Sequence, residues 1–141
     1  MNKTFVTVLG VGALLLAGCG SDDKADDNHA QACTDFAAAQ KKLVDYGIDG
    51  KQSLTLEQFT AAKTETIGSM DSAGLSTSDA DVKSRISTLV TDIPTETVKL
   101  MTSKSVAESF NSNSTAVARA CESAGTTITV SKIRIIGYMG P

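Results

Sequence analysis

Apolar residues recur every three or four positions between residues 32 and 124, which is the period of an amphipathic α-helix. Short polar stretches interrupt the pattern, which therefore predicts four long helices. Helices joined by short loops favour an up-down arrangement, so the expected fold is an all-α four-helix bundle over residues 32–125. The apolar faces are expected to be Cys33, Phe36, Ala37, Leu43 and Val44, with Gln40 as a polar interruption; Leu56, Phe59, Ala62, Ile67 and Met70; Val82, Ile86, Leu89, Val90 and Ile93; and Val106, Phe110, Val117, Cys121 and Ala124.

Capping residues mark the starts of two of these helices. Thr55 and Gln58 have the spacing of a capping box, in which each side chain bonds the backbone of the other residue. Ser78 is the expected cap of the third helix. Asp79 and Asp81 then lie in its first turn, where the helix dipole favours negative charge.

Glycine and proline mark where the helices are expected to stop. Gly47 ends the first helix near residue 46, Gly74 breaks the second, and Pro94 ends or kinks the third. Residues 98–101 are expected to form a further turn or two after Pro94. Ser103 or Ser105 then starts the last long helix.

The C-terminal residues Thr126–Pro141 differ in composition from the helices. Threonine, isoleucine and valine dominate this segment, as in β-strands. Ile128 and Val130 share one alternation phase whereas Ile133 and Ile135 take the other, so no single face stays apolar. A single strand is not stable alone. The segment is therefore expected to cover the bundle as an extended arm, and pairing with the sheet edge of a partner is the alternative.

The N-terminal residues have the pattern of an export signal. Lys3 precedes an apolar run over residues 5–17, which is too short to cross a bilayer and has the length of a signal-peptide apolar region. The run ends in Leu16-Ala17-Gly18-Cys19, which resembles the lipobox of bacterial lipoproteins. The resemblance implies that cleavage between Gly18 and Cys19 removes residues 1–18 and that the Cys19 thiol carries a diacylglycerol.

Lipidation at Cys19 would hold the mature protein on the outer face of the cell membrane without spanning it, because two acyl chains suffice for stable anchoring. Residues 19–31 follow as an expected flexible tether, since Asp22, Asp23, Asp26 and Asp27 leave little apolar surface to bury. A metal site at this acidic cluster is the less favoured interpretation. His29 is assigned no role. Few asparagines and a single expected disulfide favour a Gram-positive source.

Two cysteines remain once Cys19 is lipidated, and export to an oxidising compartment favours a disulfide between them. Cys33 lies in the first turn of the first expected helix and Cys121 in the last turn of the fourth. These helix ends meet if the two helices pack antiparallel. The alternative, a reactive thiol pair, lacks a C-x-x-C spacing and basic neighbours.

The segment Asp45–Glu57 resembles a calcium-binding EF-hand loop, with Asp45 at its first position, Asp49 at its fifth and Gly50 at its sixth. Leu56 occupies the twelfth position, where the family has a bidentate glutamate, and Glu57 comes one residue late. Calcium requires six to eight oxygen ligands. An ordinary inter-helix connection is therefore the favoured interpretation, with no metal expected and Asp45, Asp49 and Glu57 as weak candidate ligands.

Composition narrows the functions open to the chain. It has 13 basic and 16 acidic residues, a net charge of −3, one histidine and no tryptophan. This balance argues against nucleic-acid binding, which needs a basic excess. The sequence contains no phosphate-binding loop, metalloprotease motif or nucleophile elbow. We therefore expect no enzyme, no catalytic residue and no cofactor.

The expected function is that of a membrane-anchored surface lipoprotein whose bundle binds an envelope protein, not identified by the sequence. The alternative is a carrier that holds a small apolar ligand, such as a lipid, between its helices. A third hypothesis is a prophage-encoded lipoprotein that excludes superinfecting phages. The small size of the chain is compatible with that hypothesis.

Overall fold

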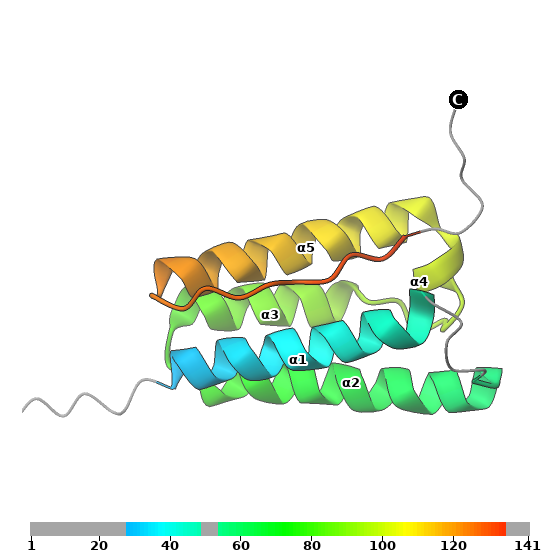
Figure 1. Cartoon of the computed structure of the whole chain (residues 1–141), viewed down its shortest axis with the longest axis horizontal. Coiled ribbons are helices and arrows are strands. Elements are labelled where there is room, and N and C mark those ends of the chain that lie inside the picture. The colour runs from blue at the N-terminus through cyan, green and yellow to red at the C-terminus, as the bar shows by residue number, and fades with distance from the viewer. Residues whose placement is uncertain (1–27, 49–53, 135–141) are drawn as a thin grey trace, which may run out of the picture.

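The computed structural model describes residues 28–48 and 54–134, and in that part of the chain the regular secondary structure is helical. The helices are α1 (His29–Ile48), α2 (Leu56–Ser76), α3 (Ala80–Asp92), α4 (Lys99–Thr102) and α5 (Lys104–Ser123). The four long helices run alternately up and down, and α4 is a single turn between α3 and α5 (Figure 1). This arrangement confirms the expected all-α, four-helix up-down bundle.

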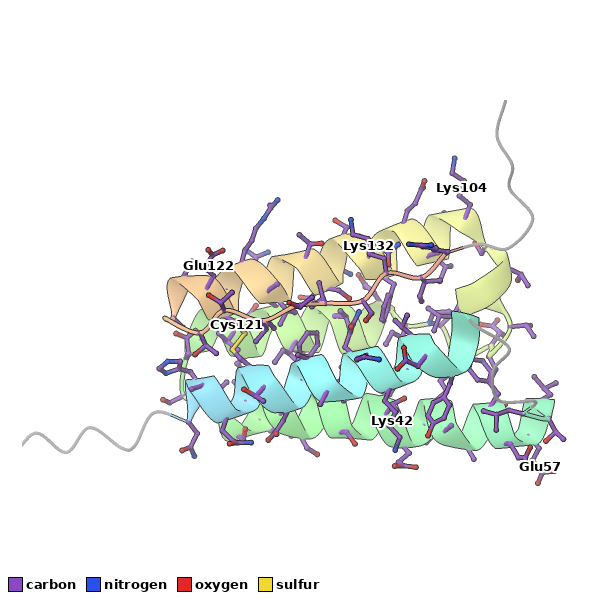
Figure 2. The ribbon with its side chains drawn as sticks, in the orientation of Figure 1. Lys42, Glu57, Lys104, Cys121, Glu122 and Lys132 are labelled. Carbon is purple, nitrogen blue, oxygen red and sulfur yellow. A yellow bond between two sulfur atoms is a disulfide. The ribbon has the colours of Figure 1, made fainter. Side chains whose placement is uncertain are left out.

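The bundle is elongated (Figure 1). Glu57 at the start of α2 and Cys121 near the end of α5 lie at opposite ends (Figure 2). Within residues 28–48 and 54–134, no helix combines the length and the apolar character needed to cross a bilayer.

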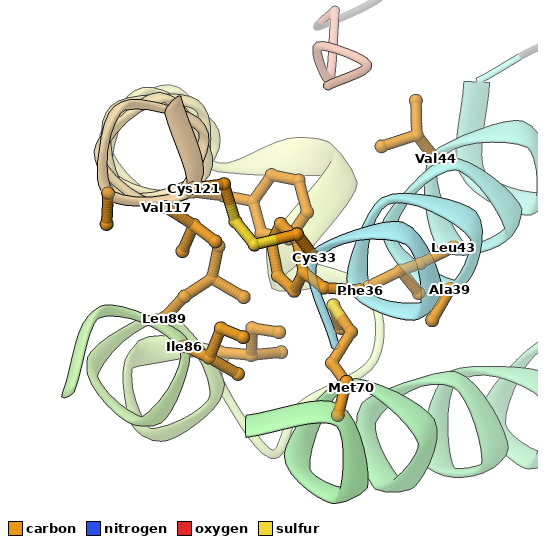
Figure 3. Close-up of a cluster of buried hydrophobic side chains, with 14 of the residues drawn as sticks. Cys33, Phe36, Ala39, Leu43, Val44, Met70, Ile86, Leu89, Val117 and Cys121 are labelled. Carbon is orange, nitrogen blue, oxygen red and sulfur yellow. A yellow bond between two sulfur atoms is a disulfide. The ribbon is translucent and has the colours of Figure 1, made fainter. Parts of the chain in front are cut away.

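The core lies along the axis between the four long helices (Figure 3). The predicted faces of α3 and α5 are confirmed: Val82, Ile86 and Leu89 are buried on α3, and Phe110 and Val117 on α5. The largest fully buried side chains are those of Phe36, Leu43, Met70, Ile86, Leu89, Leu100, Gln40, Val82, Val117, Thr66, Cys33 and Cys121.

The predicted face of α2 is wrong in part. Leu56 is 62% exposed, whereas Lys63 and Thr66 are buried. Thr66 can be buried because its hydroxyl donates to the carbonyl oxygen of Ala62 one turn earlier (2.9 Å). The buried positions of α2 are Phe59, Lys63, Thr66, Met70, Ala73 and Gly74.

Gly74 does not break α2, contrary to the sequence prediction, because the helix continues to Ser76. Its missing side chain is instead required by packing. A Cβ atom at residue 74 would lie 2.9 Å from Cγ2 of Ile86 on α3. Glycine here allows α2 and α3 to approach closely, at the position where the sequence indicated a helix end.

The helix starts agree with the sequence except at α1 and α3. The Thr55 hydroxyl accepts from the Gln58 N–H (3.2 Å), and Gln58 Oε1 accepts from the Thr55 N–H (2.9 Å), which confirms the capping box. The cap of α3 is Asp79 and not Ser78, because Asp79 Oδ1 accepts from two N–H groups of the first turn. Helix α1 begins at His29 rather than near residue 32 and runs past Gly47.

The end of α5 turns the chain back along the bundle. Gly125 has a φ of 93°, and the Thr126 N–H donates to the Cys121 carbonyl oxygen (2.8 Å) while the Gly125 N–H donates to that of Glu122 (2.9 Å). This pair of bonds is a Schellman motif, which requires a left-handed residue and favours glycine. It directs residues 126–134, here called the tail, back between α5 and α1 (Figure 1).

Candidate functional site

The cysteine bridge joins the start of α1 to the end of α5. Cys33 and Cys121 form a disulfide with their Cα atoms 5.9 Å apart, and both side chains are fully buried. The sequence prediction is therefore confirmed, and so is its reason: the two helices are antiparallel. The bridge secures one end of the contact between them.

Several predicted site residues lie outside the described part of the chain. These are Gly18, Cys19, the tether up to residue 27 and Asp49. Residues 29–31, which were expected to form the end of the tether, belong to α1, and His29 is the first helical residue.

The two described candidates for calcium lie on different helices. Asp45 is inside α1 and forms an ion pair with Lys41, one turn earlier. Glu57 lies in the first turn of α2. In the described residues, no group of three or more histidine, cysteine, aspartate or glutamate side chains could hold a metal ion.

A shallow groove of about 710 Å³ follows the outer contact between α1 and α2. Small residues form its floor, among them Ala38, Gly68 and Ser72. Lys42 on α1 and Glu65 on α2 form an ion pair across it, with Nζ and Oε1 2.7 Å apart. The floor combines alanine, glycine and serine, so the groove offers both apolar and hydroxyl contacts.

A smaller groove of about 330 Å³ lies between α2 and α3, beside the close approach at Gly74. Leu75 lines it and is 65% exposed. Lys83 and Ser84 of α3 complete its wall. This groove therefore combines an exposed apolar side chain with a cation.

The space between α1 and α5, here called the seam, is occupied by the tail. Gln40 of α1 is fully buried there. Its Nε2 donates to the Ser131 carbonyl oxygen (2.6 Å), and its Oε1 accepts from the Ser131 N–H (2.9 Å). The same Nε2 lies 3.3 Å from the buried hydroxyl oxygen of Ser114 on α5. One amide thus connects both helices and the tail.

Asn111 of α5 forms the same pair of backbone hydrogen bonds with Ile133, two residues after Ser131 in the tail. Its Nδ2 donates to the Ile133 carbonyl oxygen (3.0 Å), and its Oδ1 accepts from the Ile133 N–H (2.8 Å). The Ile133 side chain is buried in the core cluster, while Ile128 and Val130 pack against that cluster. The tail is therefore the arm that the sequence favoured. Ile135 lies outside the described residues.

A buried lysine holds the connection after α3. Lys63 Nζ donates to the carbonyl oxygens of Pro94 and of Thr95, the latter at 2.9 Å. Burial lowers the pKa of Lys63 because the charged ammonium is desolvated, and the nearby Glu96 carboxylate opposes this effect. The side chain thereby connects the middle of α2 to the segment that leads into α4.

Sequence reasoning missed the roles of three polar residues: Gln40, Asn111 and Lys63. The position of Gln40 could have indicated its burial, because it interrupts an otherwise apolar face. No sequence pattern indicated the roles of Asn111 and Lys63, since their partners are backbone atoms far along the chain.

Comparison with protein-family models gave no match, and neither the curated proteins nor the solved structures include a protein that matches this chain.

Proposed function

We propose that this protein is a membrane-anchored surface lipoprotein whose bundle is a non-enzymatic binding module for a protein of the bacterial cell envelope. Residues 1–19 support the anchor, because a basic residue, an apolar run and the sequence Leu16-Ala17-Gly18-Cys19 have the order of a lipoprotein signal. Attachment at Cys19 raises the concentration of the module next to partners on the same membrane.

The packing of the bundle's centre is the observation that favours an interaction module over a lipid carrier. Phe36, Met70 and Ile86 are fully buried and meet where a carried ligand would have to lie (Figure 3). A lipid could enter only if these side chains moved apart. A protein partner needs no such movement, because it can bind the bundle without entering the space between these three side chains.

The anchor is tested by metabolic labelling of cells with a tagged palmitate. The unchanged chain is expected to carry the label and to sediment with membranes. Cys19→Ser should lose both properties, because the thiol that accepts the diacylglycerol is absent. Gly20→Ala is the matched control and should keep the label. A labelled Cys19→Ser chain would contradict the proposed anchor.

The binding function is tested by crosslinking in living cells with an amine-reactive reagent, followed by mass spectrometry of the linked peptides. Lys99, Lys104 and Lys132 are exposed, and Lys104 projects from the start of α5 while Lys132 lies on the tail (Figure 2). We expect a recurrent protein neighbour linked through at least one of them. Changing that lysine to arginine should remove the link and keep the fold. An unlinked monomer recovered with co-extracted lipid would instead favour the carrier.

A further inference from the structure

The seam has the properties of a binding site for an extended peptide. Helix α1 packs mainly on α2, and α5 mainly on α3, so the tail occupies the space where α1 and α5 face each other (Figure 1). In the described part of the chain, the hydrogen bonds between the tail beyond Thr126 and the helices all involve Gln40 or Asn111.

In the tail, these two side chains bind main-chain atoms only. Each amide offers one donor and one acceptor to the N–H and C=O of a single residue, as a neighbouring β-strand would. Ser131 and Ile133 are bound in this way, two residues apart. Recognition through the backbone does not depend on the side chains of the bound segment, so another extended chain could form the same four bonds.

The helices themselves hold part of the site in place. Gln40 is fully buried while the tail is bound, and its Nε2 lies 3.3 Å from the Ser114 hydroxyl oxygen, a contact that does not involve the tail. Hydrogen bonds to an extended chain offset the cost of burying this amide, so the seam favours a chain that offers backbone N–H and C=O groups. Specificity would come from the place of Ile133, the tail residue whose side chain is buried most completely.

We propose that the seam binds an extended segment of a partner protein and that the tail is its displaceable internal ligand. The segment would carry a branched apolar residue at the place of Ile133 and, two residues earlier, a small residue. Neither position could be proline, because both backbone N–H groups donate. A second copy's tail is less favoured as occupant, because tail exchange replaces each contact by an identical one. This inference rests on the proposed binding function.

The test uses the full chain in detergent and a fluorescent peptide of residues 126–134, with binding followed by anisotropy. In the unchanged chain the resident tail competes and binding should be weak. Ile133→Asp in the chain weakens its own tail, so the peptide should bind at least tenfold more tightly, because a larger fraction of chains is open. Lys132→Asp changes an exposed neighbour and should behave as the unchanged chain.

Two further variants test whether the contacts are those of the seam. A peptide with Ser131→Pro lacks the N–H that Gln40 accepts and should not bind. Adding Gln40→Leu to the Ile133→Asp chain should remove the gain in affinity. A folded Ile133→Asp chain that binds the peptide no better than the unchanged chain would overturn the proposal. A tail-exchanged dimer of the full chain would overturn its assignment to a foreign segment.

If Ile133→Asp does not fold, hydrogen exchange of the unchanged chain tests whether the tail leaves the seam while the bundle stays folded. The amides of Ser131 and Ile133 should exchange at least tenfold faster than that of Leu89 in the core, because the tail opens by itself. Equal protection would mean that the tail leaves only on global unfolding and would overturn the proposal. A cellular crosslink without peptide binding would leave the proposed function intact and reject this site.

Discussion

At the scale of single residues, two glycines of α2 lie in opposite environments. Gly74 is buried against Ile86, where a Cβ atom would come within 2.9 Å of Cγ2. Gly68 is exposed, and no heavy atom lies within 4 Å of the place where its Cβ would be. The same substitution at these two positions therefore separates helix propensity from packing.

We expect Gly68→Ala to stabilise the fold by about 0.5–1 kcal/mol, because alanine has the higher helix propensity. Gly74→Ala should destabilise it by a net ~1 kcal/mol or more, since overpacking of a core costs about 1–3 kcal/mol. Urea denaturation of the purified variants measures both free energies of unfolding. Stabilisation by Gly74→Ala would contradict the close approach of α2 and α3.

Lys63 makes the stability of the fold depend on pH. Its pKa in the folded chain lies below the ordinary value of 10.5 because of burial. Between the lowered pKa and 10.5, the unfolded chain binds a proton that the folded chain has released. The contribution of Lys63 to the free energy of unfolding therefore rises with pH across this window.

Lys63→Met removes the titrating group and keeps an unbranched side chain that is one atom shorter. The free energy of unfolding of the unchanged chain minus that of Lys63→Met should increase with pH as the ordinary lysine pKa of 10.5 is approached from below. Chemical denaturation at a series of pH values measures this difference. A difference that is constant or falls with pH would contradict the desolvation of Lys63.

At the scale of elements, the side chain of Asn111 holds the tail to α5, and a second asparagine of the same helix provides a comparison. Asn111 binds the backbone of Ile133, whereas Asn113 of the same helix donates to the exposed Asp92 carboxylate (2.8 Å). Asn111→Ala should lower the free energy of unfolding by about 1–3 kcal/mol, because two partly buried backbone groups lose their partner. Asn113→Ala is the control and should cost less than about 1 kcal/mol. Equal effects in urea denaturation would contradict this role of Asn111.

The elements also differ in how well their periodicity predicted the buried face. Helix α3 buries the apolar positions expected of it, because both its neighbours contact it through apolar side chains. Helix α2 buries Lys63, which no apolar pattern can reveal, since its burial depends on carbonyl oxygens beyond the end of α3. In the tail, Val130 and Ile133 both pack toward the core although they are three residues apart, so they do not belong to one alternating face. The change falls at Ser131, whose N–H donates to Gln40.

At the scale of the whole molecule, the disulfide closes a loop between residues 88 positions apart. Replacing both Cys33 and Cys121 by alanine should lower the free energy of unfolding by about 4–5 kcal/mol in the chain-entropy model. Denaturation in urea measures the change, and reduction of the unchanged chain should produce a similar loss. Cys19→Ser is the control, because it leaves the bridge intact. A loss under ~1 kcal/mol would contradict a stabilising role of the bridge.

The sequence by itself determined the features that depend on neighbours along the chain. The helical period, the Thr55–Gln58 capping box and the stop before Pro94 follow from contacts within a few residues. The cysteine pairing was also predicted, because the expected lipidation of Cys19 leaves Cys33 and Cys121 as the pair, and the structure confirms their bridge.

Only the tertiary structure decided which polar residues are buried and where the tail lies. Gln40, Lys63 and Asn111 bind backbone atoms 91, 31 or 32, and 22 residues away, respectively. A side chain gains such a partner only when separate elements pack together, and buried polar groups are tolerated only with such partners. The large sequence separation of these bonded partners is the physical reason why the seam could not be predicted from the order of residues.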